Sequence, residues 1–143
     1  IVPWYAQKNL QEKQLDLIFS QAVMEHVIQP EPKTAYQMMF SLLKNEGMIS
    51  HTIDFSAHEI HKVWNGHWFM NKFVWKIIMH GRSYPINRYP YSYHKKLIEN
   101  QGFKIVKEIP SKDNDSIKVK KKNISDEDYI TKNAYMLAMK KEA

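Results

Sequence analysis

The sequence predicts an α/β fold built on a partial doubly wound, Rossmann-like sheet. Residues 15–20 form a short apolar run typical of a buried parallel strand. A helical pattern over 33–44 ends at the turn 45–47, and a second strand pattern follows over 48–55. Because strand, helix, glycine turn and strand make half of a doubly wound unit, we expect a mostly parallel sheet with helices on both faces.

The remaining segments supply further helices and strands. We expect helices over residues 22–27, 59–79 and 91–100, with a helix start at 125–128. We expect strands over residues 103–109 and 133–140, with the lysine run 118–122 as a loop.

The composition fits one globular domain over residues 1–143. The chain is 43% hydrophobic and 25% charged, and at this length folding buries roughly two thirds of the unfolded surface without help from disulfides. The lack of cysteine excludes a disulfide scaffold, a cysteine metal site and a cysteine nucleophile, and it fits a reducing cytoplasm. No apolar run reaches the roughly 20 residues that cross a membrane. We therefore predict a cytoplasmic protein.

Residues 56–100 form a basic, aromatic segment unlike its flanks. Between Phe55 and Lys104 eight lysines and arginines stand against two acidic residues, so this stretch carries the whole net charge of +6. Lysine and arginine interleaved with tryptophan and tyrosine are typical of single-strand nucleic-acid binding. A non-enzymatic module that binds nucleic acid or another polyanion is therefore an alternative to an enzyme, and a basic helix on a membrane surface is a third possibility.

The four glycines are too scattered to form a phosphate-binding loop. Gly47, Gly66, Gly81 and Gly102 are at least 15 positions apart, whereas such loops need closely spaced glycines. The sequence also begins at Ile1 rather than methionine, and we expect it to be a piece of a longer polypeptide.

Four segments resemble class I S-adenosylmethionine-dependent methyltransferases. Residues 16–27 resemble the family's fourth strand and following helix, because an Asp is followed by an apolar strand, a polar turn and then Glu-His. Residues 42–49 are similar to the passage into its fifth strand, with Asn-Glu-Gly where Pro-Gly-Gly is usual. Residues 101–106 resemble the entry to its sixth strand, and 134–141 resemble its closing antiparallel strand.

The resemblance implies the carboxyl-terminal half of such a catalytic domain. Residues 50–55, with Asn87 and Arg88, are similar to one bacterial subgroup of mostly uncharacterised members. The family's glycine loop, its ribose-holding acid and its adenine contacts have no counterpart. The resemblance implies that the cofactor is S-adenosylmethionine and that the acceptor is a small molecule. It also implies that residues 56–100 form a helical insertion over the active-site side.

The implied half-domain leads to expectations about partners. The missing amino-terminal half would come from the same or a second polypeptide, and we expect the isolated chain to be inactive. Because an unpaired strand edge invites association, we also expect the isolated chain to form a homodimer or to aggregate.

Candidate site residues follow the strand ends, where ligands of open α/β sheets bind. The resemblance implies that the backbone of Ser20 and Gln21 lines the methionine part of the cofactor, unless these are only polar turn residues. Asp54 is expected to contact the substrate and His58 to act as general base; the alternative is a capping Asp and a solvated His. His51 points to the opposite face from Asp54 and is a further substrate candidate.

Two further pairs have alternative roles. Glu25 and His26 could orient or deprotonate a substrate, or could buttress the fold, as this pair does in much of the family. Arg88, beside Asn87, could hold an anionic substrate group through its guanidinium, or could pack on nearby tyrosines.

Two patterns in the basic segment have simpler readings. The histidines of His58-Glu59-Ile60-His61 stand three apart rather than four, so we predict no metal site. Trp64, Trp68 and Trp75 fall at helical spacings, which favours packing on the sheet or at the mouth of the site over an aromatic cage.

Overall fold

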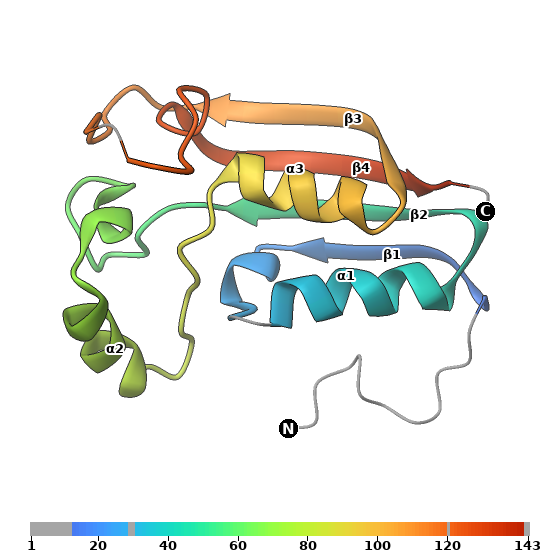
Figure 1. Ribbon diagram of the computed structural model, residues 1–143, viewed down its shortest axis with the longest axis horizontal. Coiled ribbons are helices and arrows are strands. Elements are labelled where there is room, and N and C mark those ends of the chain that lie inside the picture. The colour runs from blue at the N-terminus through green and yellow to red at the C-terminus, as the bar shows by residue number, and fades with distance from the viewer. Residues whose placement is uncertain (1–12, 29–30, 120, 142–143) are drawn as a thin grey trace.

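The computed structural model describes residues 13–28, 31–119 and 121–141, and they form one mixed four-stranded sheet (Figure 1). The strands are β1 (Leu15–Gln21), β2 (Leu43–Asp54), β3 (Phe103–Lys112) and β4 (Thr131–Lys140), in the spatial order β1-β2-β4-β3. β1 and β2 run parallel, and β4 is antiparallel to both β2 and β3. The predicted α/β sheet with an antiparallel last strand is therefore confirmed.

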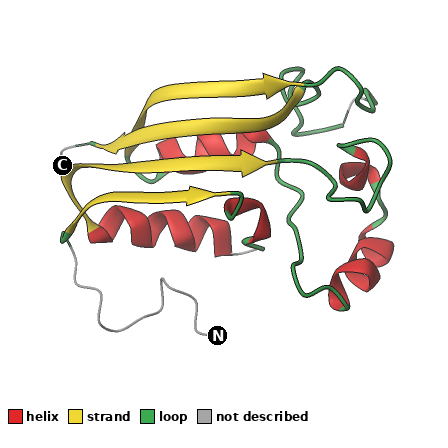
Figure 2. Ribbon diagram, turned by 180° about the vertical axis from the view of Figure 1, so that it is seen from behind, coloured by secondary structure: helices red, strands yellow, loops and turns green. Residues whose placement is uncertain are grey.

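Two helices cover one face of this sheet. The helices are α1 (Glu31–Leu42), α2 (Lys72–His80) and α3 (Tyr91–Asn100), with single 3-10 turns η2 (Met24–His26) and η3 (Gly66–Phe69). Tyr36 of α1 forms a hydrogen bond with His94 of α3, and its ring also contacts His51 of β2. α1 and α3 therefore lie together on the face of β2 that carries His51 (Figure 2).

The opposite face of the sheet has no helix over it among the described residues. Phe19 of β1 is 77% exposed there, and Leu17 is 51% exposed. Ser50 of β2 reaches Tyr135 of β4 across this face. We expected helices on both faces, and in the described part of the chain they cover only one.

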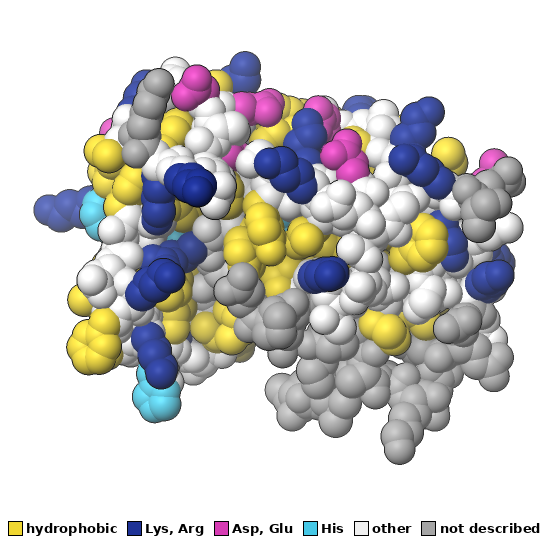
Figure 3. All heavy atoms as spheres, viewed as in Figure 1, with side chains coloured by type: hydrophobic (Ala, Val, Ile, Leu, Met, Phe, Trp, Pro, Cys, Tyr) yellow, Lys and Arg dark blue, Asp and Glu magenta, His cyan; other side chains and the backbone are white. Residues whose placement is uncertain are grey.

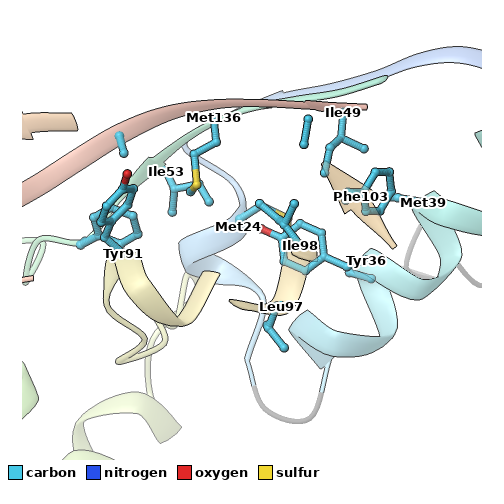
Figure 4. Packing of buried hydrophobic residues seen from close by; sticks show 14 of the residues in the cluster. Met24, Tyr36, Met39, Ile49, Ile53, Tyr91, Leu97, Ile98, Phe103 and Met136 are labelled. Carbon is cyan, nitrogen blue, oxygen red and sulfur yellow. The ribbon is translucent and has the colours of Figure 1, made fainter. Parts of the chain in front are cut away.

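The core lies between the covered face and the two helices (Figure 4). Strand alternation sends every second side chain of β2 and β4 inward, so that Ile49, Ile53 and Met136 are fully buried. Tyr36 from α1 and Ile98 from α3 fill the space beneath them. Burial of each large apolar side chain contributes roughly 1.5–3 kcal/mol, so this layer dominates the stability of the fold.

The turn expected at 45–47 is instead an irregular part of β2. Leu15 pairs with Leu43 and Leu17 with Met48, so β2 carries extra residues at this point, and Glu46 has a φ of +60°. The helix α1 thus ends earlier than expected, and the chain passes directly into the strand.

The long helix expected over 59–79 does not form. A loop leads to the 3-10 turn η3, and only residues 72–80 of this stretch form an α-helix. A Cβ at Gly66 would overlap the imidazole of His61, which accepts a hydrogen bond from the Val63 backbone. Trp64 and Trp68 are buried as the spacing suggested, but a folded-back loop buries them rather than one helix face.

Two shorter expected helices are also turns. After β1, Ala22 has a φ of +51°, and only η2 follows because Asn87 takes the carbonyls of Met24 and Val27. At 125–128, Asp128 instead accepts hydrogen bonds from Ser92 and Ser125, and so joins this turn to the first turn of α3. No helix in the described ranges is long and apolar enough to cross a membrane.

Candidate functional site

Four titratable side chains gather where β1 and β2 end. The two strands are parallel, so their carboxyl ends meet at one edge, toward η2 and the basic segment (Figure 1). Glu25 and His26 come from η2, Asp54 is the last residue of β2, and His58 follows in the next loop. We call these four residues the carboxyl-end cluster.

Asp54 and His58, the predicted catalytic pair, are neighbours. Asp54 Oδ2 lies 3.5 Å from His58 Nε2, an ion-pair distance rather than a good hydrogen bond. The other carboxylate oxygen accepts the Ser56 backbone N–H at 2.8 Å, so Asp54 also caps the turn as its alternative role required. His58 and Glu59 both have positive φ, an unfavourable conformation for non-glycine residues that often marks a functional loop.

His26 completes the cluster from the other strand end. Its ring meets the His58 ring edge-on, with centroids 5.3 Å apart. His26 Nδ1 lies 3.0 Å from the Pro85 carbonyl, which can only accept a hydrogen bond, so Nδ1 carries the proton. In the neutral ring Nε2 then keeps its lone pair and can accept a proton.

Glu25 has the fewest hydrogen-bond partners in the carboxyl-end cluster. It is only 3% exposed, and neither carboxylate oxygen has a hydrogen-bond partner among the described residues. Burial, reinforced by the nearby charge of Asp54, raises the pKa of Glu25 to about 7. A carboxyl group of this kind exchanges a proton near neutral pH, which is typical of functional sites.

Asn87 holds the cluster to the basic segment. Its side chain donates to the carbonyls of Met24 and Val27, both at 2.9 Å, and its backbone N–H donates to Glu25 O at 2.7 Å. The side chain is thus committed to positioning η2. Its predicted contact with a substrate is untested, and these bonds favour a positioning role.

Ser20, Gln21 and His51 lie at the same strand ends. Ser20 Oγ and His51 Nδ1 share a 2.7 Å hydrogen bond across the β1–β2 pair, whereas Gln21 is exposed. His51 is fully buried, and burial lowers its pKa to about 4. Its predicted contact with a substrate is untested, and its burial favours a role in the core.

Arg88 packs on a tryptophan rather than on tyrosines. Its guanidinium carbon lies 5.1 Å from the centre of the Trp75 ring, and Nη1 donates to the Met70 carbonyl at 2.8 Å. Arg88 also lines a cavity of about 780 Å³ beside α2. Contact with an anionic group therefore remains a prediction.

Sequence reasoning named Glu25 as a possible substrate contact but did not predict that it lies beside Asp54. The Glu-His pair after the first strand was the available signal in the sequence. Because a helix was expected over residues 22–27, the turn that brings Glu25 toward β2 was not predicted. Within the described ranges no group of three or more potential metal ligands is arranged to hold a metal ion.

Comparisons with known proteins identify the architecture. No family model matches the sequence, and none of the curated proteins matches it. An S-adenosylmethionine-dependent methyltransferase from Methanosarcina mazei is similar in structure over 97% of this chain and 65% of its own, with a TM-score of 0.65 and 10% identity. The chain has the fold of the class I S-adenosylmethionine-dependent methyltransferases. The predicted resemblance is confirmed at this level, whereas the bacterial subgroup stays a prediction.

Two more structures show how far this methyltransferase fold extends. A proposed methyltransferase of Haloferax volcanii, in complex with the Trm112 methyltransferase activator, matches over 97% of this chain and 59% of its own, at a TM-score of 0.59 and 11% identity. The [4+2]-cyclase SpnF matches over 97% of this chain and 54% of its own, at a TM-score of 0.56 and 10% identity. The chain thus spans about three fifths of these proteins, and the fold alone does not fix the reaction.

Proposed function

We propose that this chain supplies the carboxyl-terminal half of the active site of an S-adenosylmethionine-dependent methyltransferase that acts on a small-molecule acceptor. The carboxyl-end cluster carries the proposal. In open α/β sheets ligands bind beyond the carboxyl ends of the strands, and here that edge gathers two carboxylates and two imidazoles. In a methyltransferase fold this is where an acceptor would meet the methyl donor.

The residues present suit one end of the cofactor. A buried carboxylate without partners among the described residues, with a second carboxylate nearby, fits the positive charge of the methionine end. Ser20 and Gln21 would line this end through their backbone. The bound cofactor would supply an electrophilic methyl group on a sulfonium. The glycine loop and ribose contacts would come from an amino-terminal half on the same or a second polypeptide.

Methyl transfer to an oxygen or nitrogen acceptor also requires a base. An acceptor O–H or N–H would have to lose its proton as the acceptor took up the methyl group that the cofactor would supply. His58 would take that proton, and Asp54 beside it would stabilise the resulting imidazolium. His26, with Nδ1 held by Pro85, offers Nε2 as an alternative base.

The proposal includes a protein partner and a cytoplasmic location. The Haloferax volcanii neighbour was solved with an activator, which supports a search for a second polypeptide bound to this chain. Self-association of the isolated chain through β1 is the other possibility, because β1 pairs on one side only among the described residues.

Ligand-observed NMR with S-adenosylmethionine tests the proposal on the 143-residue chain. We expect weak binding, with a Kd on the order of 1 mM, because the chain carries half of the contacts. Gln21→Lys adds a positive charge at the strand end and should abolish the signal, whereas Asn45→Lys, at the other end of the sheet, should not. Submicromolar binding would contradict the missing half, and an absence of binding at 10 mM would contradict the proposal.

A further inference from the structure

The cavity beside α2 is a second feature of the basic segment. It has a volume of about 780 Å³, and its wall combines α2, the 85–90 loop and residues 121–124. Several lysine and arginine side chains lie over this part of the molecule, at the left of Figure 3. We call this cavity the basic pocket.

Five cationic side chains line the basic pocket, and no carboxylate does. These are Lys72, Lys76, Arg88, Lys121 and Lys122. The three lysine–carboxylate ion pairs found in the described residues lie elsewhere, at Lys44–Asp16, Lys95–Glu108 and Lys132–Asp113. The pocket therefore concentrates positive charge without a compensating group from the described chain.

The charges in the pocket oppose one another. Partial burial, followed by the charges of Arg88 and Lys72, lowers the pKa of Lys121. An anion in the pocket would relieve this repulsion, because an opposite charge at close range favours the charged form of each lysine.

Four aromatic side chains also line the pocket: Trp68, Trp75, Tyr89 and Tyr93. Tyr89 and Tyr93 stack with centroids 4.1 Å apart, and Arg88 lies over Trp75. Trp68 is 1% exposed, and its indole N–H has no hydrogen-bond partner among the described residues. The aromatic rings thus give this part of the wall a largely apolar surface.

We propose that the basic pocket binds a small molecule that joins an oxyanion, phosphate or carboxylate, to a planar apolar body. Arg88 and the lysines receive the oxyanion, and the aromatic wall receives the apolar body. The volume lies within the 300–1,000 Å³ typical of small-molecule sites, which favours this ligand over a nucleic-acid strand. The proposal does not depend on methyl transfer.

Calorimetry with four probes tests the pocket on the 143-residue chain. We expect 1-naphthyl phosphate and 1-naphthoate to bind at least tenfold more tightly than neutral 1-naphthol or inorganic phosphate, because only the first two carry both features. The ratio between phosphate and carboxylate affinities then identifies the preferred oxyanion. Equal affinity for 1-naphthol would overturn the role of charge, and equal affinity for inorganic phosphate would overturn the aromatic part.

Matched variants locate the binding. Lys72 and Lys76 are exposed on α2, and Lys104 and Lys107 are exposed on β3 away from the pocket, so both pairs tolerate glutamine. The double variant Lys72→Gln/Lys76→Gln should bind 1-naphthyl phosphate with about tenfold lower affinity. The double variant Lys104→Gln/Lys107→Gln should change this affinity less than twofold.

Two results would overturn the proposal. The first is an equal loss of affinity in both double variants, which would indicate attraction to net charge alone. The second is tighter, steeply salt-dependent binding of an oligothymidylate, which would indicate a polyanion surface instead.

Discussion

The sheet with its two packed helices and the segment over residues 56–90 are held together in different ways. In the first region strand pairing and a shared apolar layer fix the chain. In the second, side chains bond to distant backbone: Asn65 to Ile117, Arg88 to Met70. Apolar periodicity in the sequence therefore predicts the structure of the first region, whereas single polar contacts determine the path of the chain in the second.

Removal of a buried imidazole from the first region should give the largest loss of stability. His94 is fully buried, bonds to Tyr36 and contacts the ring of Phe55, so His94→Ala leaves a cavity and an unpaired hydroxyl. We expect the free energy of unfolding in urea to fall by about 3 kcal/mol. His80→Ala, at an exposed position on α2, should cost less than about 0.5 kcal/mol. Equal losses would erase the contrast between the regions.

Glu25→Gln should stabilise the protein, and only at high pH. The folded-state pKa of Glu25 is raised to about 7, so its contribution to stability is present below its ordinary pKa of 4.5 and is lost as the pH rises through 7. Glutamine mimics the neutral acid and avoids this loss. Urea unfolding should give a gain of about 3 kcal/mol at pH 8 and little gain at pH 5. A pH-independent effect would mean that Glu25 is not buried beside Asp54.

Asn87→Ala should loosen the joint between the regions. The variant removes the donor to two carbonyls of the η2 turn, and we expect a loss of about 2 kcal/mol. Amide hydrogen exchange should rise at Glu25 and His26 but not along β4. Arg88→Gln, which leaves the η2 bonds intact, should not raise exchange at those two residues.

Gly66→Ala should have the smallest effect, and its sign is informative. The new methyl group would displace His61 from its bond with Val63, so we expect a loss of about 1 kcal/mol. In a continuous helix over 59–79 the same change would instead stabilise by up to about 1 kcal/mol. Gly81→Ala is the control, since nothing lies within 4 Å of its added Cβ.

These contrasts explain which parts of the fold the sequence predicts. The strands at 15–21 and 131–140 and the helix at 91–100 have periodic patterns that packing on one sheet reinforces. The tryptophans at 64 and 68 have helical spacing too, but they are buried by a loop that a glycine and His61 shape. No periodic signal in the sequence encodes such contacts.

The candidate site was predictable in place but not in detail. Parallel strand ends put Asp54 and Ser20 at one edge, as the strand pattern in the sequence predicted. The approach of Glu25 and His26 depends on Asn87, about 60 positions further along, which replaces a helix by one turn. The basic pocket likewise needs Lys121 beside Arg88, a contact between segments far apart in the chain.

Protein-observed NMR tests the central claim most directly, because it locates the ligand rather than only detecting it. In a titration of the ¹⁵N-labelled chain with S-adenosylmethionine, we predict that amide shifts concentrate at Ser20, Gln21, Glu25 and His26 and at the end of β2. The control positions are β3 and α2, which should stay unchanged. Shifts confined to the basic pocket or to β3, with none at the ends of β1 and β2, would contradict the account.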